Sequence, residues 1–257
     1  LSYLRDGEVT TDFVNAGEIV VKISGFGNFE GEREVSYEIT KISLTSSLVS
    51  KPGTIENSMY RLADEIFDNT EKKKVLSLIF EGVNLIEDDY TATYSSQSLV
   101  NVQEDIIITV VGKGNFEGEI KFIYNIAPAS VTGDRIEITI SVDEEGTPFT
   151  GKEIKPTVQV IDKGADLSQN IDVTQYFDIS YSNNINVSYS NGEIISGAVI
   201  TIKGTGNYTE TYTVNFKITP VDISTLSFDE IEDVTFDGNA HRILPTLVLD
   251  EYTLVEN

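Results

Sequence analysis

The chain has 257 residues, with 42 acidic against 18 basic side chains and a formal net charge of −24 at pH 7. Phosphate-rich partners attract lysine and arginine, so this charge argues against binding to nucleic acid or to an anionic membrane. Cysteine is absent, which excludes a disulfide-stapled scaffold, and the length suffices for about two domains with cores of their own.

The composition favours strands. Tyrosine and phenylalanine occur 12 times each, and β-branched residues come in short runs, as on the half-buried surfaces of sheets. The sequence has no apolar run of about 18 residues and no basic-then-apolar start. We therefore expect neither a membrane-inserted segment nor a signal peptide within it.

The first stretch, residues 1–42, contains a predicted strand ending at Tyr3 and a predicted hairpin over 17–39 (GEIVVKISGFGNFEGEREVSYEI). Apolar residues from Ile19 to Ile23 alternate with more polar ones. This period of two indicates a strand with one buried face. The G-x-G-N-F turn of the hairpin contains glycine and asparagine, which both tolerate positive φ.

The second stretch, residues 43–127, repeats this pattern. Its hairpin lies at 104–126, after a strand that ends at Tyr94 and a phenylalanine turn with its following strand at 67–78. The turn is expected at Asn69. The region 43–66 is the least repetitive, and residues 58–67 have the composition of one or two helical turns.

The third stretch, residues 128–220, contains the same elements in the same order. The phenylalanine turn and its strand fall at 149–160, the tyrosine strand ends at Tyr181 and the hairpin covers 197–218. The turn is expected at Gly151. Pro156 predicts an edge position for the strand that follows, because proline cannot donate a ladder hydrogen bond.

The last stretch, residues 221–257, contains a further phenylalanine turn and strand at 236–247, with Gly238 in the turn and Pro245 at an expected strand edge. The glycines that open the hairpin turns recur about every 90 residues, a spacing that suits one small β-sandwich per repeat. They are Gly25, Gly112 and Gly204.

The order of elements therefore predicts an all-β fold of tandem, immunoglobulin-like β-sandwich modules. Complete modules are expected at 43–127 and 128–220, with the C-terminal part of a module at 1–42 and the N-terminal part of another at 221–257. The junctions Thr40-Lys41, Ala127-Pro128 and Thr219-Pro220 leave almost no linker. Such short connections predict an elongated, stiff rod in which each module contacts its neighbours.

Three segments, FTGKEIKPTV, YFDISYSNNIN and AVITIKGTGNYTETYTVNFKITP, together resemble the immunoglobulin-like repeats of large bacterial cell-surface and secreted proteins. The resemblance covers nearly the whole chain and is strongest at 149–220. It implies a stalk, or repeats that accompany adhesive and carbohydrate-active domains, and it brings no catalytic residues. The stretch 43–127 departs from the pattern, because Asn69 replaces the turn glycine and no Asn-Asn pair follows Tyr94.

The sequence offers little for catalysis. The chain has no cysteine and one histidine, His241, which we interpret as a surface residue. The G-x-G motifs join strand to strand, whereas a phosphate-binding loop leads into a helix. We therefore expect the protein not to be an enzyme and to need no cofactor.

Acidic clusters are the candidate metal sites, because calcium prefers carboxylate oxygens. Glu87, Asp88 and Asp89 form one cluster. The candidates near module starts, where carboxylates of adjoining modules could share a calcium ion, are Asp143, Glu144, Glu145, Asp229, Glu230 and Asp233. Solvated surface carboxylates are the alternative. Asn125 and Asn215 lie on last strands but at outward positions, which argues against an isopeptide bond with a buried lysine.

The function predicted from the sequence is a non-enzymatic spacer, stalk or adhesin shaft at a bacterial cell surface, cell wall or in a secreted protein. One alternative is a module whose loops bind a cell-surface glycan or protein, for which asymmetric aromatic-rich loops would be evidence. The other is an immunoglobulin-like virion appendage or capsid-decorating protein.

Overall fold

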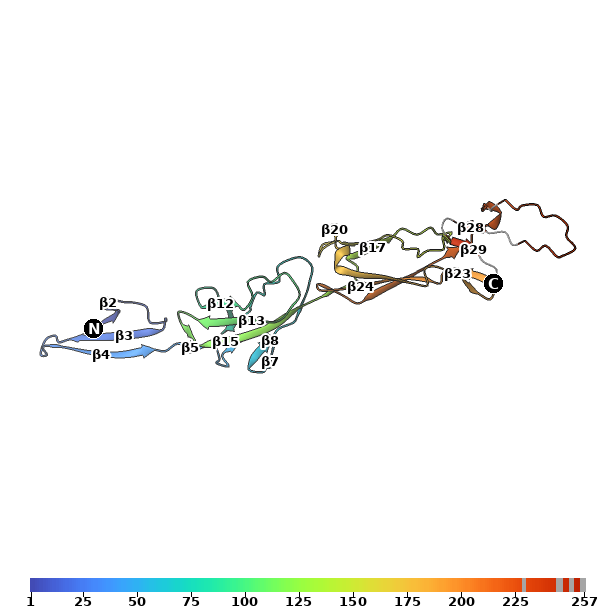
Figure 1. Ribbon diagram of the computed structural model, residues 1–257. Helices are drawn as coiled ribbons and strands as arrows, with labels where there is room; N and C mark the ends of the chain where they lie inside the picture. The colour runs from blue at the N-terminus through green and yellow to red at the C-terminus, as the bar shows by residue number, and fades with distance from the viewer. Residues whose placement is uncertain (228–229, 244–246, 250–251, 255–257) are drawn as a thin grey trace. The chain divides into compact units, whose positions relative to one another are not determined.

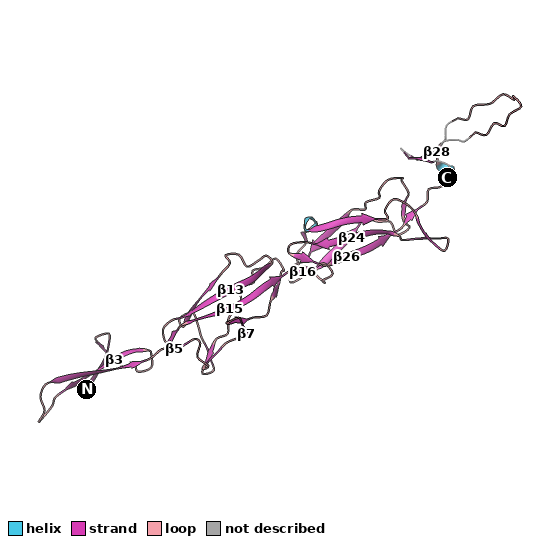
Figure 2. Ribbon diagram, turned by 60° about the horizontal axis from the view of Figure 1, so that its bottom comes forward, coloured by secondary structure: helices cyan, strands magenta, loops and turns pink. Residues whose placement is uncertain are grey.

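The computed structural model describes residues 1–227, 230–243, 247–249 and 252–254. The described chain consists of strands and loops, with two short 3₁₀ turns at Thr174–Tyr176 and Ile223–Thr225 (Figure 2). It separates into two compact units, Leu1–Ala127 and Pro128–Asn257. No helix among the described residues is long and apolar enough to cross a membrane.

The first unit begins with an antiparallel sheet of order β2-β1-β3-β4 (Figure 1). Its strands are β1 (Ser2–Arg5), β2 (Glu8–Val9), β3 (Gly17–Ser24) and β4 (Glu32–Ile39). The pair β3 and β4 is the predicted glycine hairpin, and β1 is the predicted tyrosine strand, with Tyr3 opposite Val21. Among the described residues, these four strands pair only with one another.

The rest of the first unit is a β-sandwich. One sheet has the order β12-β13-β15-β8-β7, with β9 also on β15, and the other has the order β11-β10-β6. The strands are β5 (Ile42–Ser43), β6 (Val49–Ser50), β7 (Thr54–Glu56), β8 (Met59–Arg61), β9 (Glu65–Ile66), β10 (Ile79–Phe80), β11 (Val83–Asn84), β12 (Tyr90–Tyr94), β13 (Gln103–Gly112), β14 (Phe116–Glu117) and β15 (Glu119–Ala127).

The second unit contains the same sandwich. Its main sheets have the orders β21-β24-β26 and β17-β19-β20. The strands are β16 (Ala129–Ser130), β17 (Ile136–Ile140), β18 (Thr147–Pro148), β19 (Val158–Asp162), β20 (Ile171–Asp172), β21 (Phe177–Ser182), β22 (Ser188–Ser190), β23 (Glu193–Ile195), β24 (Ala198–Gly204), β25 (Tyr208–Thr209), β26 (Thr211–Phe216), β27 (Ile218–Thr219), β28 (Leu247–Leu249) and β29 (Tyr252–Leu254).

Each sandwich is closed by two parallel pairings. The leading strand of the module pairs with the residues that follow the glycine turn, as Ile42 does with Phe116 and Ala129 does with Tyr208. The residues before the phenylalanine turn pair with the end of the last strand, β9 with β15 and β18 with β27. These pairings bring the first and second halves of each module together.

The core follows the predicted alternation. In the second stretch Ile106, Ile108 and Val110 are buried on β13, and in the third Ile200 and Ile202 are buried on β24. Burial of such side chains stabilises each module by roughly 2 kcal/mol per residue. Together with the sheet pairings, these cores define an all-β chain built of immunoglobulin-like β-sandwich modules.

The two glycines of each hairpin turn have different roles. A Cβ atom on Gly112 would lie 2.6 Å from the amide nitrogen of Glu117, and one on Gly204 would lie 2.7 Å from that of Thr209. The second glycine has positive φ, for example 58° at Gly114. Positive φ was expected at the asparagine as well, and that expectation is wrong, because the asparagine of each turn has negative φ.

Two local expectations are also wrong. Residues 58–67 contain the strands β8 and β9 and no helical turn, because parallel pairing with β15 fixes them as extended chain. The stretches 71–78 and 151–157 were expected to be strands, yet no strand is present between Glu71 and Leu78 or between Gly151 and Thr157. Pro156 lies in the second stretch, and Pro245 lies outside the described residues.

Candidate functional site

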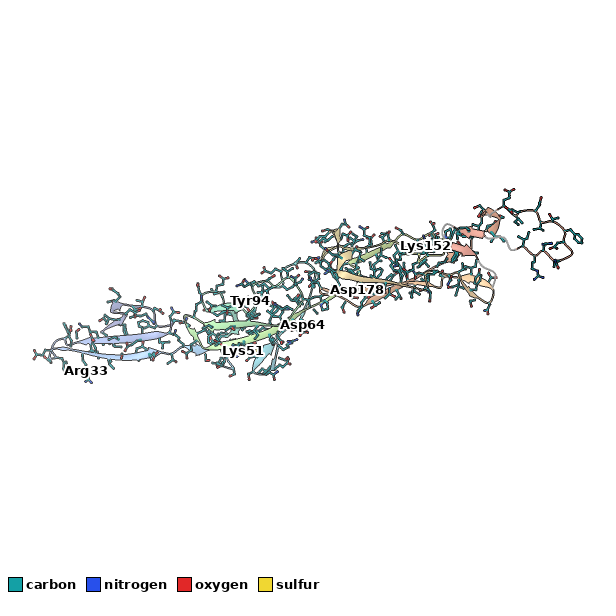
Figure 3. The ribbon with its side chains drawn as sticks, viewed as in Figure 1. Arg33, Lys51, Asp64, Tyr94, Lys152 and Asp178 are labelled. Carbon is teal, nitrogen blue, oxygen red and sulfur yellow. The ribbon has the colours of Figure 1, made fainter. Side chains whose placement is uncertain are left out.

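Each module has a stretch without strands, 71–78 or 151–157, and this stretch accepts a hydrogen bond from a tyrosine hydroxyl. Tyr94 donates a hydrogen bond of 2.7 Å to the carbonyl oxygen of Lys74 (Figure 3), and Tyr181 donates one of 2.7 Å to that of Pro156. In module 43–127 a second hydroxyl, that of Tyr124, donates to the carbonyl oxygen of Lys72 at 2.8 Å. The tyrosine strand therefore fixes the position of the segment that makes no sheet hydrogen bonds.

Burial raises the pKa of Tyr94 and raises that of Tyr124 to about 12, with nearby acidic groups adding to the effect. The ammonium group of Lys74 lies 5.5 Å from the ring centroid of Tyr124 and pairs with the carboxylate of Glu65. These contacts fix the tyrosines as structural donors in their neutral form.

The turn that follows β5 in module 43–127 is stabilised by hydrogen bonds from Lys51. Its ammonium group donates to the carbonyl oxygens of Leu44 and Ser46 at 3.0 and 2.7 Å, and burial lowers its pKa. Lys51 also lies 5.9 Å from the ring centroid of Tyr60 on β8. The contact joins the turn after β5 to β8 of the larger sheet, next to the edge strand β7.

The junction between the first sheet and module 43–127 contains a direct polar contact. The side chain of Asn115 accepts a hydrogen bond of 2.7 Å from the amide nitrogen of Ala16 and donates one of 2.8 Å to the side-chain oxygen of Asn15. Asn115 belongs to the G-x-G-N-F turn. The turn of one module therefore bonds directly to a loop of the preceding one.

The loop that meets Asn115 is held by Arg5. The guanidinium group donates to the carbonyl oxygens of Asn15 and Ala16 at 2.8 and 2.9 Å and lies 3.8 Å from a carboxylate oxygen of Asp12. Hydrogen bonds from Asn15 and Val14 lower the pKa of Asp12 to about 2. These contacts hold the loop in one conformation. The amide of Ala16 and the side chain of Asn15 are therefore already positioned to bond with Asn115.

A groove of about 410 Å³ lies beside this junction. Its apolar walls come from both sides, with Val14 and Ile39 from the first sheet and Ile42, Phe80 and Phe116 from module 43–127. The rings of Phe80 and Phe116 are 5.5 Å apart in an edge-to-face arrangement. Apolar contact and the asparagine pair together oppose free rotation at this junction.

A more polar groove of about 500 Å³ lies in module 43–127. Tyr90 and Tyr94 line it, together with Lys73, Lys113 and Glu87. The ammonium group of Lys73 lies 5.6 Å from the ring centroid of Tyr94. Lysines beside tyrosine rings suit an acidic sugar or another small anion.

The predicted calcium ligands that the structure describes are exposed. Asp143, Glu144 and Glu145 form a turn, in which the carbonyl oxygen of Asp143 accepts a hydrogen bond from the amide of Gly146. Glu230 and Asp233 lie on exposed chain, and Asp229 lies outside the described residues. Within the described part of the chain, no three histidine, cysteine or acidic side chains come together as metal ligands.

The other predicted candidates have local partners. Asp89 accepts a hydrogen bond of 3.0 Å from the amide of Ile86. His241 is exposed and lies 2.8 Å from a carboxylate oxygen of Asp237, whose pKa is lowered chiefly by hydrogen bonds from Asn239. Asn125 bonds to Asp64, and Asn215 donates to the carbonyl oxygen of Ser196.

The sequence pointed to Asn115 only as a turn residue. Its role at the junction needs the loop at 12–16 to be placed beside it, and the two lie about a hundred residues apart in the chain. The recurrence of asparagine at Asn28, Asn115 and Asn207 was the available signal, because a turn with glycine at the positive-φ position does not itself require asparagine.

No family model and no curated protein match the chain. Among solved structures it is similar to the protocadherin gammaB7 EC3-6 cis-dimer structure, at 16% identity and a TM-score of 0.22, covering 69% of this chain and 49% of that one. It is also similar to surface layer protein SbsC, domains 4-9, at 15% identity and a TM-score of 0.22, covering 87% and 37%.

The chain thus spans half or less of the length of these two structures. A third similarity, to the PcdhgB3 EC1-4 structure, has 11% identity and a TM-score of 0.20, covering 86% of this chain and 64% of that one. Similarities with TM-scores of this size do not indicate a function. The modules and the junction of the chain itself are the basis for the proposal that follows.

Proposed function

We propose that the chain is a non-enzymatic spacer or stalk within an extracellular bacterial surface protein of the immunoglobulin-like repeat type. The observation that carries the proposal is the junction contact of Asn115 with Asn15 and Ala16. Such a contact has a mechanical use, because a module fixed to its neighbour can hold a more distant domain at a set distance. The high negative charge supports a well-solvated surface.

The arrangement of the modules supports the same function. The Thr40-Lys41 junction leaves two residues between β4 and β5, so the chain has little freedom to bend there. Each module buries its own core, so a load along the chain is resisted by several independent folded units. Neighbouring modules of the same longer chain are accordingly the main partners in this proposal.

Small-angle scattering on the full chain in a dilution series tests the spacer function. We expect an extended, rigid profile, and we expect Asn115→Ala to broaden the distribution of dimensions because the junction then loses its hydrogen bonds to Asn15 and Ala16. Asn28→Ala, the same substitution in the exposed turn of the first sheet, is the matched control and should leave the distribution unchanged. A compact globule at every dilution would overturn the spacer proposal.

Calcium is tested in the same measurement with millimolar Ca²⁺ and then with a chelator. Stiffening only with Ca²⁺ would assign the exposed carboxylates at Asp143 and Glu230 a role as shared junction ligands. An identical profile after chelation would leave the asparagine contact and the short linker as the sources of stiffness.

A second candidate function is binding of an acidic glycan in the groove between Tyr90, Tyr94, Lys73 and Lys113. The observation that favours it is the ammonium group of Lys73, which lies 5.6 Å from the ring centroid of Tyr94 in this groove. Titration with an acidic polysaccharide tests it, with Lys73→Ala/Lys113→Ala as the variant. Equal binding by the variant would reject this site.

A further inference from the structure

We propose that module 43–127 binds an extended segment of a partner protein as an added strand beside residues 73–77. The surface involved is the main chain of Lys73, Val75 and Ser77 on the side away from β11, and it is called the open edge below. The bound segment has branched apolar residues at alternate positions and an acidic residue beside Lys73. The inference goes beyond the proposed spacer function and does not depend on it.

Module 128–220 contains the strand that module 43–127 lacks at this place. β17 pairs with β19 over five residues, and Thr139 lies opposite Gln159. The corresponding pairing in module 43–127, of β6 with β10, covers two residues and stops at Ser50. Ser77 has the place of Gln159, and within the described chain no strand pairs with residues 73–77. Both halves of module 43–127 are described, so the vacancy does not arise from an end of the chain.

Pro52 explains why the pairing of β6 with β10 is short. It has the place that Thr139 has in β17, and proline has no N–H to donate to a neighbouring strand. Gly53 follows with φ of 88°. The chain then leaves this sheet and forms β7 and β8, of which β8 pairs with β15 in the other sheet. The sequence of module 43–127 therefore diverts its own strand from the vacant position.

Residues 71–78 have the alternation of a strand although they lie outside the described sheets. Leu76 and Leu78 are 8% and 0% exposed, whereas Val75 is 97% exposed. The other residues of the open edge are exposed as well. A period of two is that of extended chain, so the open edge already has the conformation that a neighbouring strand needs. Little conformational freedom is lost on its side when a strand is added.

The main-chain groups of the open edge point toward the vacant position. Successive peptide groups of an extended chain point to opposite edges, and the carbonyl oxygen of Leu78 uses the other edge, where it accepts a hydrogen bond from the amide of Leu85. Within the described chain, no hydrogen bond reaches the main chain of the open edge. In module 128–220 the same edge is occupied, because the carbonyl oxygen of Thr157, the counterpart of Val75, accepts a bond of 2.9 Å from the amide of Ser141. An unpaired row of this kind is a template for an added strand.

Lys73 is the charged group at one end of the open edge. The lysines on either side of it pair with Asp68 and Glu65. No carboxylate in the described part of the chain pairs with Lys73, whose ammonium group lies 5.6 Å from the ring centroid of Tyr94. An acidic residue of the bound segment therefore has an available partner there.

β17 and the residues after it show which side chains suit the position. In module 128–220 Ile140 is half-buried and Thr139 is exposed. A segment with the sequence of residues 139–143 (TISVD), placed in the register of β17, has its isoleucine beside Leu76 and its aspartate beside Lys73. The partner segment therefore alternates small polar with branched apolar residues and ends with a carboxylate.

The occupant is a partner of this chemistry rather than a second copy of the chain. Each copy has a formal net charge of −24, so two copies repel each other. In a second copy the segment 139–143 begins within β17, and the pairing of β17 with β19 would have to break first. An extended partner segment has no such pairing to lose. Its main-chain hydrogen bonds supply affinity, and its alternate side chains supply specificity.

A synthetic peptide of residues 138–144 (ITISVDE) is the probe, because it contains the sequence that fills this position in module 128–220. The labelled peptide is titrated with the full chain, and binding is followed by fluorescence anisotropy. We expect saturable binding that Val75→Pro weakens about tenfold, because proline removes one donor of the open edge. Val75→Thr keeps that donor at the same exposed position, so this matched control should bind as the native chain does.

Methylation of single peptide nitrogens tests the register without changing the protein. The amide of Ser141 donates to the carbonyl oxygen of Thr157 in module 128–220, whereas the amide of the preceding isoleucine faces the opposite edge of the strand. We expect methylation at Ser141 to weaken binding about tenfold and methylation at Ile140 to leave it unchanged. These measurements use the native chain, so they still test the register if Val75→Pro unfolds module 43–127.

Three results would overturn the proposal. One is the absence of saturable binding by the native chain. Another is equal binding of the two methylated peptides, or binding by folded Val75→Pro equal to that of the native chain, since either places the peptide elsewhere. The third is concentration-dependent association of the native chain alone that Val75→Pro abolishes in sedimentation, because the occupant is then a second copy.

Discussion

The hydroxyl of Tyr181 donates a hydrogen bond of 2.7 Å to the carbonyl oxygen of Pro156. Tyr94 makes the same bond to Lys74 in the preceding module, although proline and lysine have nothing in common as side chains. The acceptor is the main chain, so the contact constrains only the tyrosine. This explains how the repeat tolerates different residues in the strandless stretch while its tyrosine recurs.

Replacement of these tyrosines should destabilise each module separately. Tyr94→Phe and Tyr181→Phe each remove one hydroxyl donor and leave a main-chain carbonyl without it, so we expect a loss of about 1 kcal/mol in the free energy of unfolding. Urea unfolding followed by hydrogen exchange of each module measures the loss. Tyr189→Phe, at an exposed tyrosine of the second unit, is the control and should leave stability unchanged.

Substitutions of the two glycines of one turn should lower the free energy of unfolding for different reasons. Gly204→Ala places a Cβ atom 2.7 Å from the amide nitrogen of Thr209, and this overlap with the main chain should cost about 3 kcal/mol. Gly206 has φ of 62° and open space around it, so Gly206→Ala should cost about 1 kcal/mol.

Asparagine separates the two mechanisms, because it tolerates positive φ but still carries a Cβ atom. Gly206→Asn should therefore be nearly neutral in thermal unfolding, whereas Gly204→Asn should be as damaging as alanine. Equal losses for the two asparagine variants would contradict the assignment of one glycine to close approach and the other to backbone conformation.

High pH should weaken module 43–127 through Tyr124. Its pKa is raised to about 12 by burial and nearby negative groups, whereas an unfolded tyrosine ionises near its ordinary value of about 10. Between these values the unfolded chain releases a proton that the folded chain retains, so the free energy of unfolding falls as pH rises. Below pH of about 10 the full contribution is present.

The measurement compares the native chain with Tyr124→Phe from pH 8 to 12. At pH 8 the variant should be less stable, because it lacks the bond to the carbonyl oxygen of Lys72. The difference should shrink as pH rises through 10 towards 12. A difference that stays constant across this range would show that ionisation of Tyr124 is not linked to folding.

Much of the fold could be predicted from the sequence, because period-two alternation determines which side chains face the core. Ile108 and Ile200 are fully buried, as their alternation predicted. Contacts between distant segments could not be predicted in this way. The parallel pairing of β8 with β15 and the bond between Asn15 and Asn115 depend on neighbours that a local pattern does not specify.

The candidate site was predicted less well than the fold. Carboxylate composition suggested calcium near Asp143, and this stays a prediction, because the separation of charged side chains in space is not encoded in their spacing along a loop. The turn motif of the hairpin did contain Asn115, the residue at the junction. Its partner loop is shaped by Arg5 hydrogen bonds, and a lone arginine beside a tyrosine strand gave no signal of that role.

One core position is occupied by an apolar residue in module 43–127 and by a charged residue in module 128–220. Asp162 and Phe80 occupy the same place, opposite Ile136 and Val49 in their sheets. Phe80 packs against Phe116. Asp162 is fully buried, pairs with Arg135 and accepts hydrogen bonds of 2.8 Å from the hydroxyl of Tyr208 and the amide of Gly164.

Breaking the polar arrangement should be costly, and replacing all of it should not. Asp162→Ala leaves the Arg135 charge and the Tyr208 hydroxyl without their buried acceptor, so we expect a loss of about 3 to 5 kcal/mol in the free energy of unfolding. The triple variant Arg135→Leu/Asp162→Phe/Tyr208→Phe transfers the residues of module 43–127 to these positions, and apolar replacement of a buried ion pair is often neutral or stabilising.

Urea unfolding of the second unit distinguishes these outcomes, with Tyr208→Phe alone as the intermediate case. If the triple variant recovers most of the stability lost in Asp162→Ala, the two modules are interchangeable solutions of one repeat, and the ion pair is not required for the fold. If the triple variant is as unstable as Asp162→Ala, the surrounding core of module 128–220 has adapted to the carboxylate, and the position cannot be exchanged between modules.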